Sequence, residues 1–171
     1  MAALSVGTKA PDFRLNCTPD QKIQLMDFKG SNLILAFYPA DWSPVCGDQL
    51  ALYNELLSDF AALNAKLVGI SVDGTWCHTA FVKDRRYRFP LLSDFHPKGN
   101  ISRAYGVYRE EEGISERALF IVDPEGKILW SYVSPLGINP GADGILKVLE
   151  SINLKPKANV DKENVHAIRA S

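Results

Sequence analysis

The stretch LILAFYPADWSPVCGDQ, residues 33–49, changes character in its middle. Its first six residues form a short, continuous apolar run, which is typical of a buried central strand. Ser43 then offers a side-chain oxygen as an N-cap, and Pro44 follows at the first helical position, where a missing N–H costs nothing. The stretch therefore predicts a buried strand, a tight turn and the start of a helix.

Apolar strands and amphipathic helices continue to alternate along the rest of the chain. Strands are expected over 66–73 and 89–94, and a hairpin over 118–133 around the turn Asp123-Pro124-Glu125-Gly126. Helices are expected over 44–64, 76–85 and 141–152, and residues 101–108 are expected to form a helix that leads into a loop. This order predicts an α/β fold in which a central mixed β-sheet is flanked by helices on both faces.

The length and composition predict one folded domain. The chain has 171 residues and 46% hydrophobic residues, enough for a real core. We expect the domain to occupy residues 1–152, because no internal repeat or long linker divides it. Residues 153–171 are polar and rich in lysine, so we expect a tail without firm structure there.

Charge and hydropathy exclude several classes of partner. The net charge is −1 and no basic stripe stands out, which argues against nucleic acid and against an anionic membrane surface. No segment approaches the roughly 18 apolar residues of a membrane span. The N-terminus lacks the basic head and long apolar stretch of a secretory signal. The expected compartment is therefore the cytosol.

Cys46 is the candidate reactive residue of the opening stretch. Its expected place, about the third helical position, faces free N–H groups and the positive end of the helix. An ordinary thiol is only about 3% ionised at neutral pH. Raising that fraction to roughly 90% requires about 3.4 kcal/mol, whereas a helix terminus supplies about 0.3–2 kcal/mol. A reactive thiol here needs a second source of charge, most simply an arginine; otherwise Cys46 is a small buried hydrophobe.

Other uses of the thiol are less well supported by the residues around it. Dithiol exchange needs Cys-x-x-Cys, and here Ser43 stands in the place of the first cysteine. A cysteine hydrolase needs a histidine base, and the chain offers only His78, His96 and His166. Those three histidines show no metal-ligand spacing, so we expect no metal and no cofactor. Three cysteines also make no disulfide framework.

The residues around Cys46 resemble a known family, the peroxiredoxins. Pro39-x-x-x-Ser43-x-x-Cys46 matches the family's signature of proline, threonine or serine, and cysteine at these spacings. The segments 10–13, 69–73, 90–94 and 113–123 also match, in the same order, so the resemblance covers roughly residues 5–152. The branch that it resembles most is the alkyl hydroperoxide reductase C and thiol-specific antioxidant group.

The resemblance implies a thioredoxin-like fold and an antioxidant enzyme, a thiol-dependent peroxidase for hydrogen peroxide or organic hydroperoxides. Cys46 matches the peroxidatic cysteine, which becomes a sulfenic acid. Ser43 matches the hydroxyl that bonds the peroxide, and Pro39 matches the residue that shields the sulfur. Arg117 matches the family's arginine, which supplies positive charge. Gln49 departs from the pattern, because the family usually has a glutamate there that pairs with arginines.

The resemblance leaves open how the sulfenic acid is reduced. The tail holds no cysteine, so the C-terminal resolving thiol of many relatives is absent. Cys77 is a candidate resolving thiol, and Cys17, in an expected exposed turn, is a weaker one. The leading expectation is a one-cysteine mechanism with an external reductant, either a thioredoxin-like protein or a small thiol. Family resemblance also implies a homodimer, and a structural role for His78.

Two alternatives remain beside the peroxidase. A thiol–disulfide oxidoreductase of the same fold would reduce disulfides without peroxide. A redox sensor would form a sulfenic acid slowly and would alter a contact with a partner instead of turning over. Only the chemistry of Cys46 separates the three.

Overall fold

The computed structural model describes residues 2–154 and contains one large sheet and one small one. The strands of the large sheet are β1 (Arg14–Asn16), β2 (Lys22–Gln24), β3 (Asn32–Phe37), β4 (Ala65–Ser71), β5 (Leu91–Ser93), β8 (Arg117–Val122) and β9 (Ile128–Ser134). β6 (Tyr108–Arg109) and β7 (Ile114–Ser115) form the small sheet. The helices are η1 (Leu25–Phe28), α1 (Pro44–Glu55), α2 (Leu57–Ala62), α3 (Thr75–Arg85), α4 (Asn100–Ala104) and α5 (Asp143–Leu154).

The large sheet is mixed, as the sequence predicts. Its strand order is β2-β1-β5-β4-β3-β8-β9. The pairs β3–β4 and β4–β5 are parallel, whereas β8 runs antiparallel to both β3 and β9. The start of β8 therefore lies beside the end of β3, with Ala118 opposite Phe37. This register places two distant parts of the sequence side by side, at the end of β3 and the start of β8.

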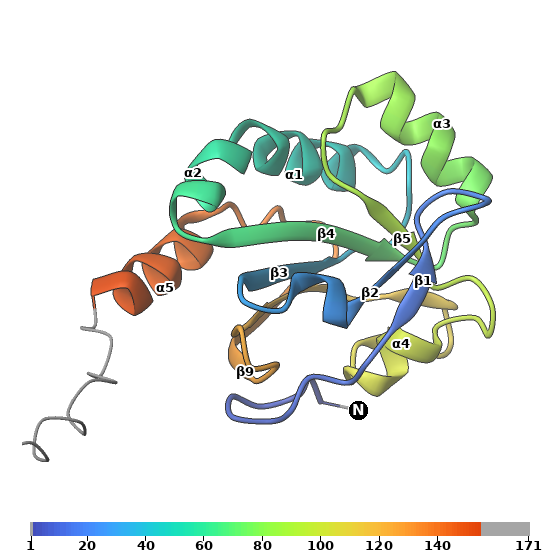
Figure 1. Ribbon diagram of the computed structural model, residues 1–171. Coiled ribbons are helices and arrows are strands. Elements are labelled where there is room, and N and C mark those ends of the chain that lie inside the picture. Colours follow the sequence, from blue (N-terminus) through green and yellow to red (C-terminus); the bar gives the residue numbers. More distant parts are fainter. Residues whose placement is uncertain (1, 155–171) are drawn as a thin grey trace, which may run out of the picture.

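Helices cover both faces of the sheet (Figure 1). On one face, α1, α2, α3 and α5 pack a core that includes Leu50, Phe60, Phe81 and Ile145. On the other face, the core includes Ile101 of α4. Successive residues of β3 point alternately into the two cores, and because both faces are buried the strand is apolar throughout. The predicted fold class is confirmed.

Several elements differ from the sequence-based expectations. The helix predicted over 44–64 is not continuous: it breaks at Leu56, whose N–H is shared between the carbonyl oxygens of Leu52 and Tyr53, at 3.2 Å each. A shared bond of this kind is common where a helix tightens at its end. The short strands β1, β2, β6 and β7 were not predicted, because two or three residues are too few to show a period.

The C-terminal helix α5 ends at Leu154, so it includes the first two residues of the expected tail. Residues 155–171 of that tail lie outside the described part of the chain. Within residues 2–154, every helix is too short or too polar to cross a lipid bilayer.

Candidate active site

Cys46 lies in the first turn of α1, directly after the turn that follows β3. Ser43 is the N-cap, Pro44 the first helical residue and Cys46 the third. The helix begins there because proline has the backbone angle of a helix and no N–H to satisfy. The side chain of Cys46 is fully buried in this chain. The thiol therefore lies at the positive end of α1, as predicted.

Arg117 meets Cys46 because of the sheet register. As the first residue of β8, it lies beside the end of β3, from which the chain turns into α1. Arg117 is only 1% exposed, and its Nη2 donates to Cys46 Sγ at 3.4 Å. The second positive group that a reactive thiol requires is thus in contact with the sulfur.

The other donors of Arg117 bind neutral oxygens. Nη1 donates to Gln49 Oε1 at 2.6 Å, and Nε and Nη2 donate to the carbonyl oxygen of Leu136 at 3.0 and 2.7 Å. Within residues 2–154, no carboxylate forms an ion pair with Arg117. Among the hydrogen-bond partners of Arg117 in the described part of the chain, Cys46 is therefore the one that can carry a negative charge.

Ser43 and Pro39 lie in the turn before α1. Pro39 is buried and Ser43 is half-buried. The expectation that the Ser43 side chain caps the helix is wrong: its carbonyl oxygen accepts the N–H of Gly47 at 2.8 Å, but its hydroxyl makes no capping bond. One of the N–H groups that need capping is already missing at Pro44. The Ser43 hydroxyl is therefore available to a ligand.

Asp41 anchors the turn from inside the protein, and sequence reasoning missed it. Its carboxylate accepts the Tyr38 hydroxyl at 2.6 Å and faces His78 Nδ1 at 2.8 Å, while its backbone N–H donates to Asp73 Oδ2 at 2.9 Å. Burial, and then Asp41, raise the pKa of Tyr38 well above its usual value, so this hydroxyl keeps its proton. Trp42 follows with a left-handed backbone (φ +64°), which such anchoring can hold in place.

A second missed residue, Tyr53, lies behind Gln49 on α1. Gln49 Nε2 donates to the Tyr53 hydroxyl at 3.2 Å, and that hydroxyl donates to the carbonyl oxygen of Gly141 at 3.0 Å. Burial raises the pKa of Tyr53 to about 12, so it is neutral at physiological pH. In the sequence, Tyr53 looks like an ordinary core aromatic. Its polar contact, 88 residues away, leaves no local signal.

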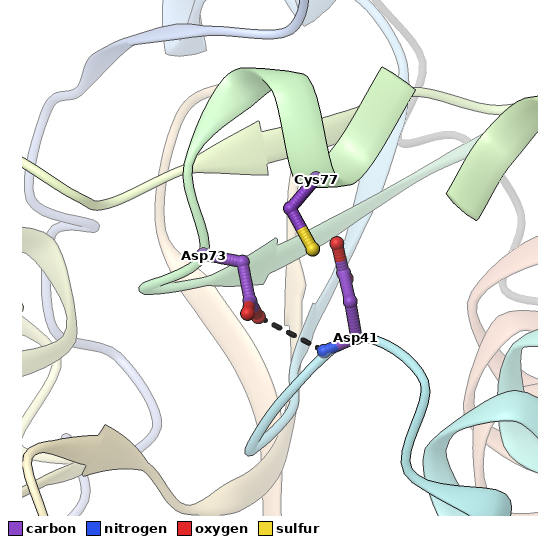
Figure 2. Close-up of side chains that lie close together, drawn as sticks. All are labelled: Asp41, Asp73 and Cys77. Carbon is purple, nitrogen blue, oxygen red and sulfur yellow. Dashed lines mark hydrogen bonds between the residues drawn. The ribbon is translucent and has the colours of Figure 1, made fainter. Parts of the chain in front are cut away.

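Cys77 lies on α3, with its sulfur among acidic groups. Figure 2 shows it directed toward the Asp41 carboxylate, with Asp73 close by. Burial, followed by the hydrogen bond and charge of Asp41, raises the pKa of the Cys77 thiol to about 11. Ligand atoms of Asp41, Asp73 and Cys77 lie within 4.8 Å of one another. Protein donors already occupy both carboxylates, including Ser71 Oγ at 2.6 Å from Asp73 Oδ2.

His78 and Cys17 complete the set of residues that the sequence singles out. His78 is fully buried against Asp41 and Tyr38, in line with a structural role. Cys17 begins the turn between β1 and β2 and is half-buried, so the expected turn is present but less exposed than predicted. None of the three cysteines forms a disulfide.

Comparison with known proteins agrees with this arrangement. The pattern of the AhpC/TSA family matches residues 6–131. A putative peroxiredoxin of Synechocystis is 37% identical over 159 residues, which is 87% of this chain and 78% of that protein. The chain belongs to the AhpC/TSA family, the peroxiredoxins.

Two further peroxiredoxin relatives extend the comparison. The mitochondrial thioredoxin-dependent peroxide reductase of Drosophila melanogaster is 33% identical over 165 residues, covering 88% of this chain and 68% of that one. The crystal structure of Enterococcus faecalis AhpC superposes with a TM-score of 0.79 at 30% identity, covering 86% of this peroxiredoxin and 92% of that chain.

Proposed function

We propose that this peroxiredoxin, a thiol-dependent peroxidase by its family, uses Cys46 as its nucleophile. The contact between Cys46 Sγ and the buried guanidinium of Arg117 is the observation that carries the proposal. An anion at that sulfur would be the counter-charge that Arg117 otherwise lacks within residues 2–154. The substrate is a hydroperoxide, either hydrogen peroxide or an organic one.

The reaction follows from the groups around the sulfur. The Cys46 thiolate attacks the terminal oxygen of the hydroperoxide, so an S–O bond forms as the O–O bond breaks. The leaving alkoxide or hydroxide takes up a proton, and Cys46 becomes a sulfenic acid. Arg117 stabilises the charge that moves from sulfur to oxygen, and the uncommitted Ser43 hydroxyl bonds the peroxide. Pro39 is buried in the same turn, and the family resemblance assigns it the role of shielding the sulfur from water.

We further propose that an external thiol reduces the sulfenic acid. The first thiol attacks the sulfur of Cys46 and releases water, and a second thiol then displaces Cys46 from the mixed disulfide. Cys77 is a poor internal substitute, because a thiol with a pKa of about 11 is rarely ionised. The reductant is a thioredoxin-like protein or a small thiol. The name of the Drosophila relative supports the first of these.

Intact-mass spectrometry after one equivalent of hydrogen peroxide tests both proposals. Wild type and Cys77→Ser should each gain one oxygen atom, whereas Cys46→Ser should gain none and should consume no peroxide in the presence of a thiol. Equal peroxide consumption by wild type and Cys46→Ser would remove Cys46 as the nucleophile. A loss of two hydrogens, mapped to a disulfide between Cys46 and Cys77, would replace the one-cysteine mechanism with an internal one.

A homodimer is the proposed assembly. It is supported by β9, which forms one edge of the seven-stranded sheet and exposes Tyr132 and Val133. An edge strand with apolar side chains on its surface is a ready template for pairing with a second chain.

The proposed compartment is the cytosol. All three cysteines are unbridged thiols, which suits a reducing compartment with a supply of thiol reductant. Fractionation of cells that produce the tagged chain tests this. Recovery of the chain in an organelle fraction would contradict it.

A further inference from the structure

We propose that Tyr53 is a positioning residue of the peroxidase site, which acts through Gln49 to hold Arg117 against Cys46. The inference rests on the proposed function of Cys46. Within residues 2–154, the Tyr53 hydroxyl is hydrogen-bonded to Gln49 and Gly141 and not to the sulfur or the guanidinium. It is linked to them by an unbroken chain of hydrogen bonds that starts at the backbone of Gly141.

The direction of every bond in this chain is fixed by one backbone carbonyl. The oxygen of Gly141 can only accept, so the Tyr53 hydroxyl must donate its single proton to it. The Tyr53 oxygen is left with lone pairs alone and must accept from Gln49. The Gln49 amide therefore presents its NH2 group to Tyr53, at 3.2 Å, and its oxygen to Arg117, at 2.6 Å.

Arg117 requires that orientation. A guanidinium has five N–H donors and no acceptor, so each of its partners must accept. If the Gln49 amide turned over, its NH2 group would face Arg117 Nη1, donor against donor. Tyr53 thus selects the one orientation of Gln49 that binds Arg117. The hydrogen bonds of Gln49 allow a single orientation of its amide.

Packing alone does not account for the hydroxyl of Tyr53. The residue is fully buried, and its ring packs edge-on against Phe60 with centroids 6.3 Å apart. A phenylalanine would fill the same space without a polar group to satisfy. Burying a hydroxyl is costly unless it is bonded, and this one joins α1 to the segment just before α5. Among residues 2–154, the one side chain that bonds this hydroxyl is Gln49.

Gln49 matters because it is neutral. It gives Arg117 an acceptor without giving it a formal counter-ion. The family's usual glutamate pairs with more than one arginine, whereas a carboxylate in this place would have Arg117 as its guanidinium partner and would compete with Cys46 for that one positive charge. The chain from Gly141 to Arg117 therefore fixes the position of the guanidinium and leaves its charge for the sulfur.

Tyr53→Phe tests the proposal, with two readouts on the full chain. The second-order rate constant for hydrogen peroxide should fall about threefold to tenfold, which corresponds to the net free-energy contribution of one hydrogen bond. The pH midpoint for alkylation of Cys46 by iodoacetamide, located by peptide mass, should rise by roughly 0.5–1 pH unit. Tyr105→Phe is the matched control: it also removes a buried hydroxyl bonded to a backbone oxygen, that of Pro11 at 2.8 Å, but on the opposite face of the sheet.

A double-mutant cycle with Gln49→Leu separates positioning from general packing. Gln49→Leu alone should shift the alkylation midpoint upward at least as far as Tyr53→Phe, and adding Tyr53→Phe to it should change neither readout further. The proposal would be overturned if Tyr53→Phe kept the wild-type rate constant and alkylation midpoint. It would also be overturned if Tyr53→Phe lowered the rate constant equally in the presence and absence of Gln49, or if Tyr105→Phe shifted the alkylation midpoint as far as Tyr53→Phe. Failure of the peroxidase proposal is distinct: wild type would then consume peroxide no faster than Cys46→Ser, while the alkylation midpoints still test Tyr53.

Discussion

At the scale of single residues, Arg117 determines the electrostatics of the site. Its guanidinium is buried, and three of its four contacts are with neutral amide or carbonyl oxygens. A buried charge costs free energy unless it is paired. The remaining contact, Cys46, therefore matters both to the charge balance of the fold and to the chemistry.

Gln49→Glu tests this charge balance directly. A carboxylate in place of the amide would lie beside Arg117 Nη1 and would pair with it, because Gln49 Oε1 is only 2.6 Å from that nitrogen. We expect the rate constant for peroxide to fall about tenfold and the pH midpoint for Cys46 alkylation to rise by about one unit. Stopped-flow kinetics and alkylation profiles measure the two. Gln21→Glu, in an exposed turn, should change neither, and a Gln49→Glu enzyme as fast as wild type would contradict the charge argument.

Cys77 gives a second prediction, which depends on pH. Its thiol pKa is raised from 9.0 to about 11, first by burial and then by Asp41, so the neutral thiol persists to high pH. At about pH 8, its thiolate population should be roughly a hundredfold smaller than that of an ordinary thiol. Peptide mass spectrometry after timed alkylation should show Cys77 lagging until the pH approaches 11. Labelling of Cys77 as fast as that of an unfolded control peptide at about pH 8 would refute this.

At the scale of elements, the turn between β3 and α1 sets the direction of the helix that carries Cys46. It must reverse the chain within the few residues from Tyr38 to Ser43, and it passes through the left-handed backbone of Trp42. Non-glycine residues rarely adopt that conformation. The turn holds because Asp41 ties it to Tyr38, to His78 on α3 and to Asp73 after β4.

Asp41→Asn should loosen this anchor. One carboxylate oxygen of Asp41 faces the Tyr38 hydroxyl and the other faces His78 Nδ1. In asparagine an NH2 group replaces one of these oxygens, and because NH2 cannot accept, one of the two donors loses its partner. We expect a loss of about 1–3 kcal/mol in the free energy of unfolding in urea, with a lower peroxide rate constant, because a buried donor is left unpaired. Asp20→Asn, in the exposed turn between β1 and β2, should cost less than about 0.5 kcal/mol. Equal stability of the two variants would argue against the anchor.

The sequence predicted the long elements because their patterns are local. The apolar runs of β3, β4 and β8 and the proline at the start of α1 are visible in short windows. The strands β1 and β2 are half-exposed segments of three residues, held by pairing with each other and with β5 through Asn16 and Ser93. Tertiary pairing of that kind leaves no period to read.

At the scale of the whole molecule, the sheet order assembles the site. Arg117 follows Cys46 by 71 residues in the chain, and only the antiparallel pairing of β8 with β3 brings them together. Family resemblance could suggest both residues, because each lies in a recognisable motif. Tyr53 and Asp41 could not be found that way. Their roles depend on partners such as Gly141 and His78, whose proximity is a property of the folded chain.

The edges of the sheet give the last prediction, which concerns assembly. β9 is the edge nearest the catalytic strands, and its Tyr132 and Val133 are 45% and 43% exposed. A lysine on an edge strand opposes pairing, since it must be buried if a second chain docks. Val133→Lys should raise the dimer dissociation constant by at least about tenfold in sedimentation equilibrium. Met26→Lys, at a residue that is 62% exposed in η1 and outside β9, should leave this constant unchanged. A monomeric wild type, or a Val133→Lys dimer of full affinity, would show that β9 is not the contact.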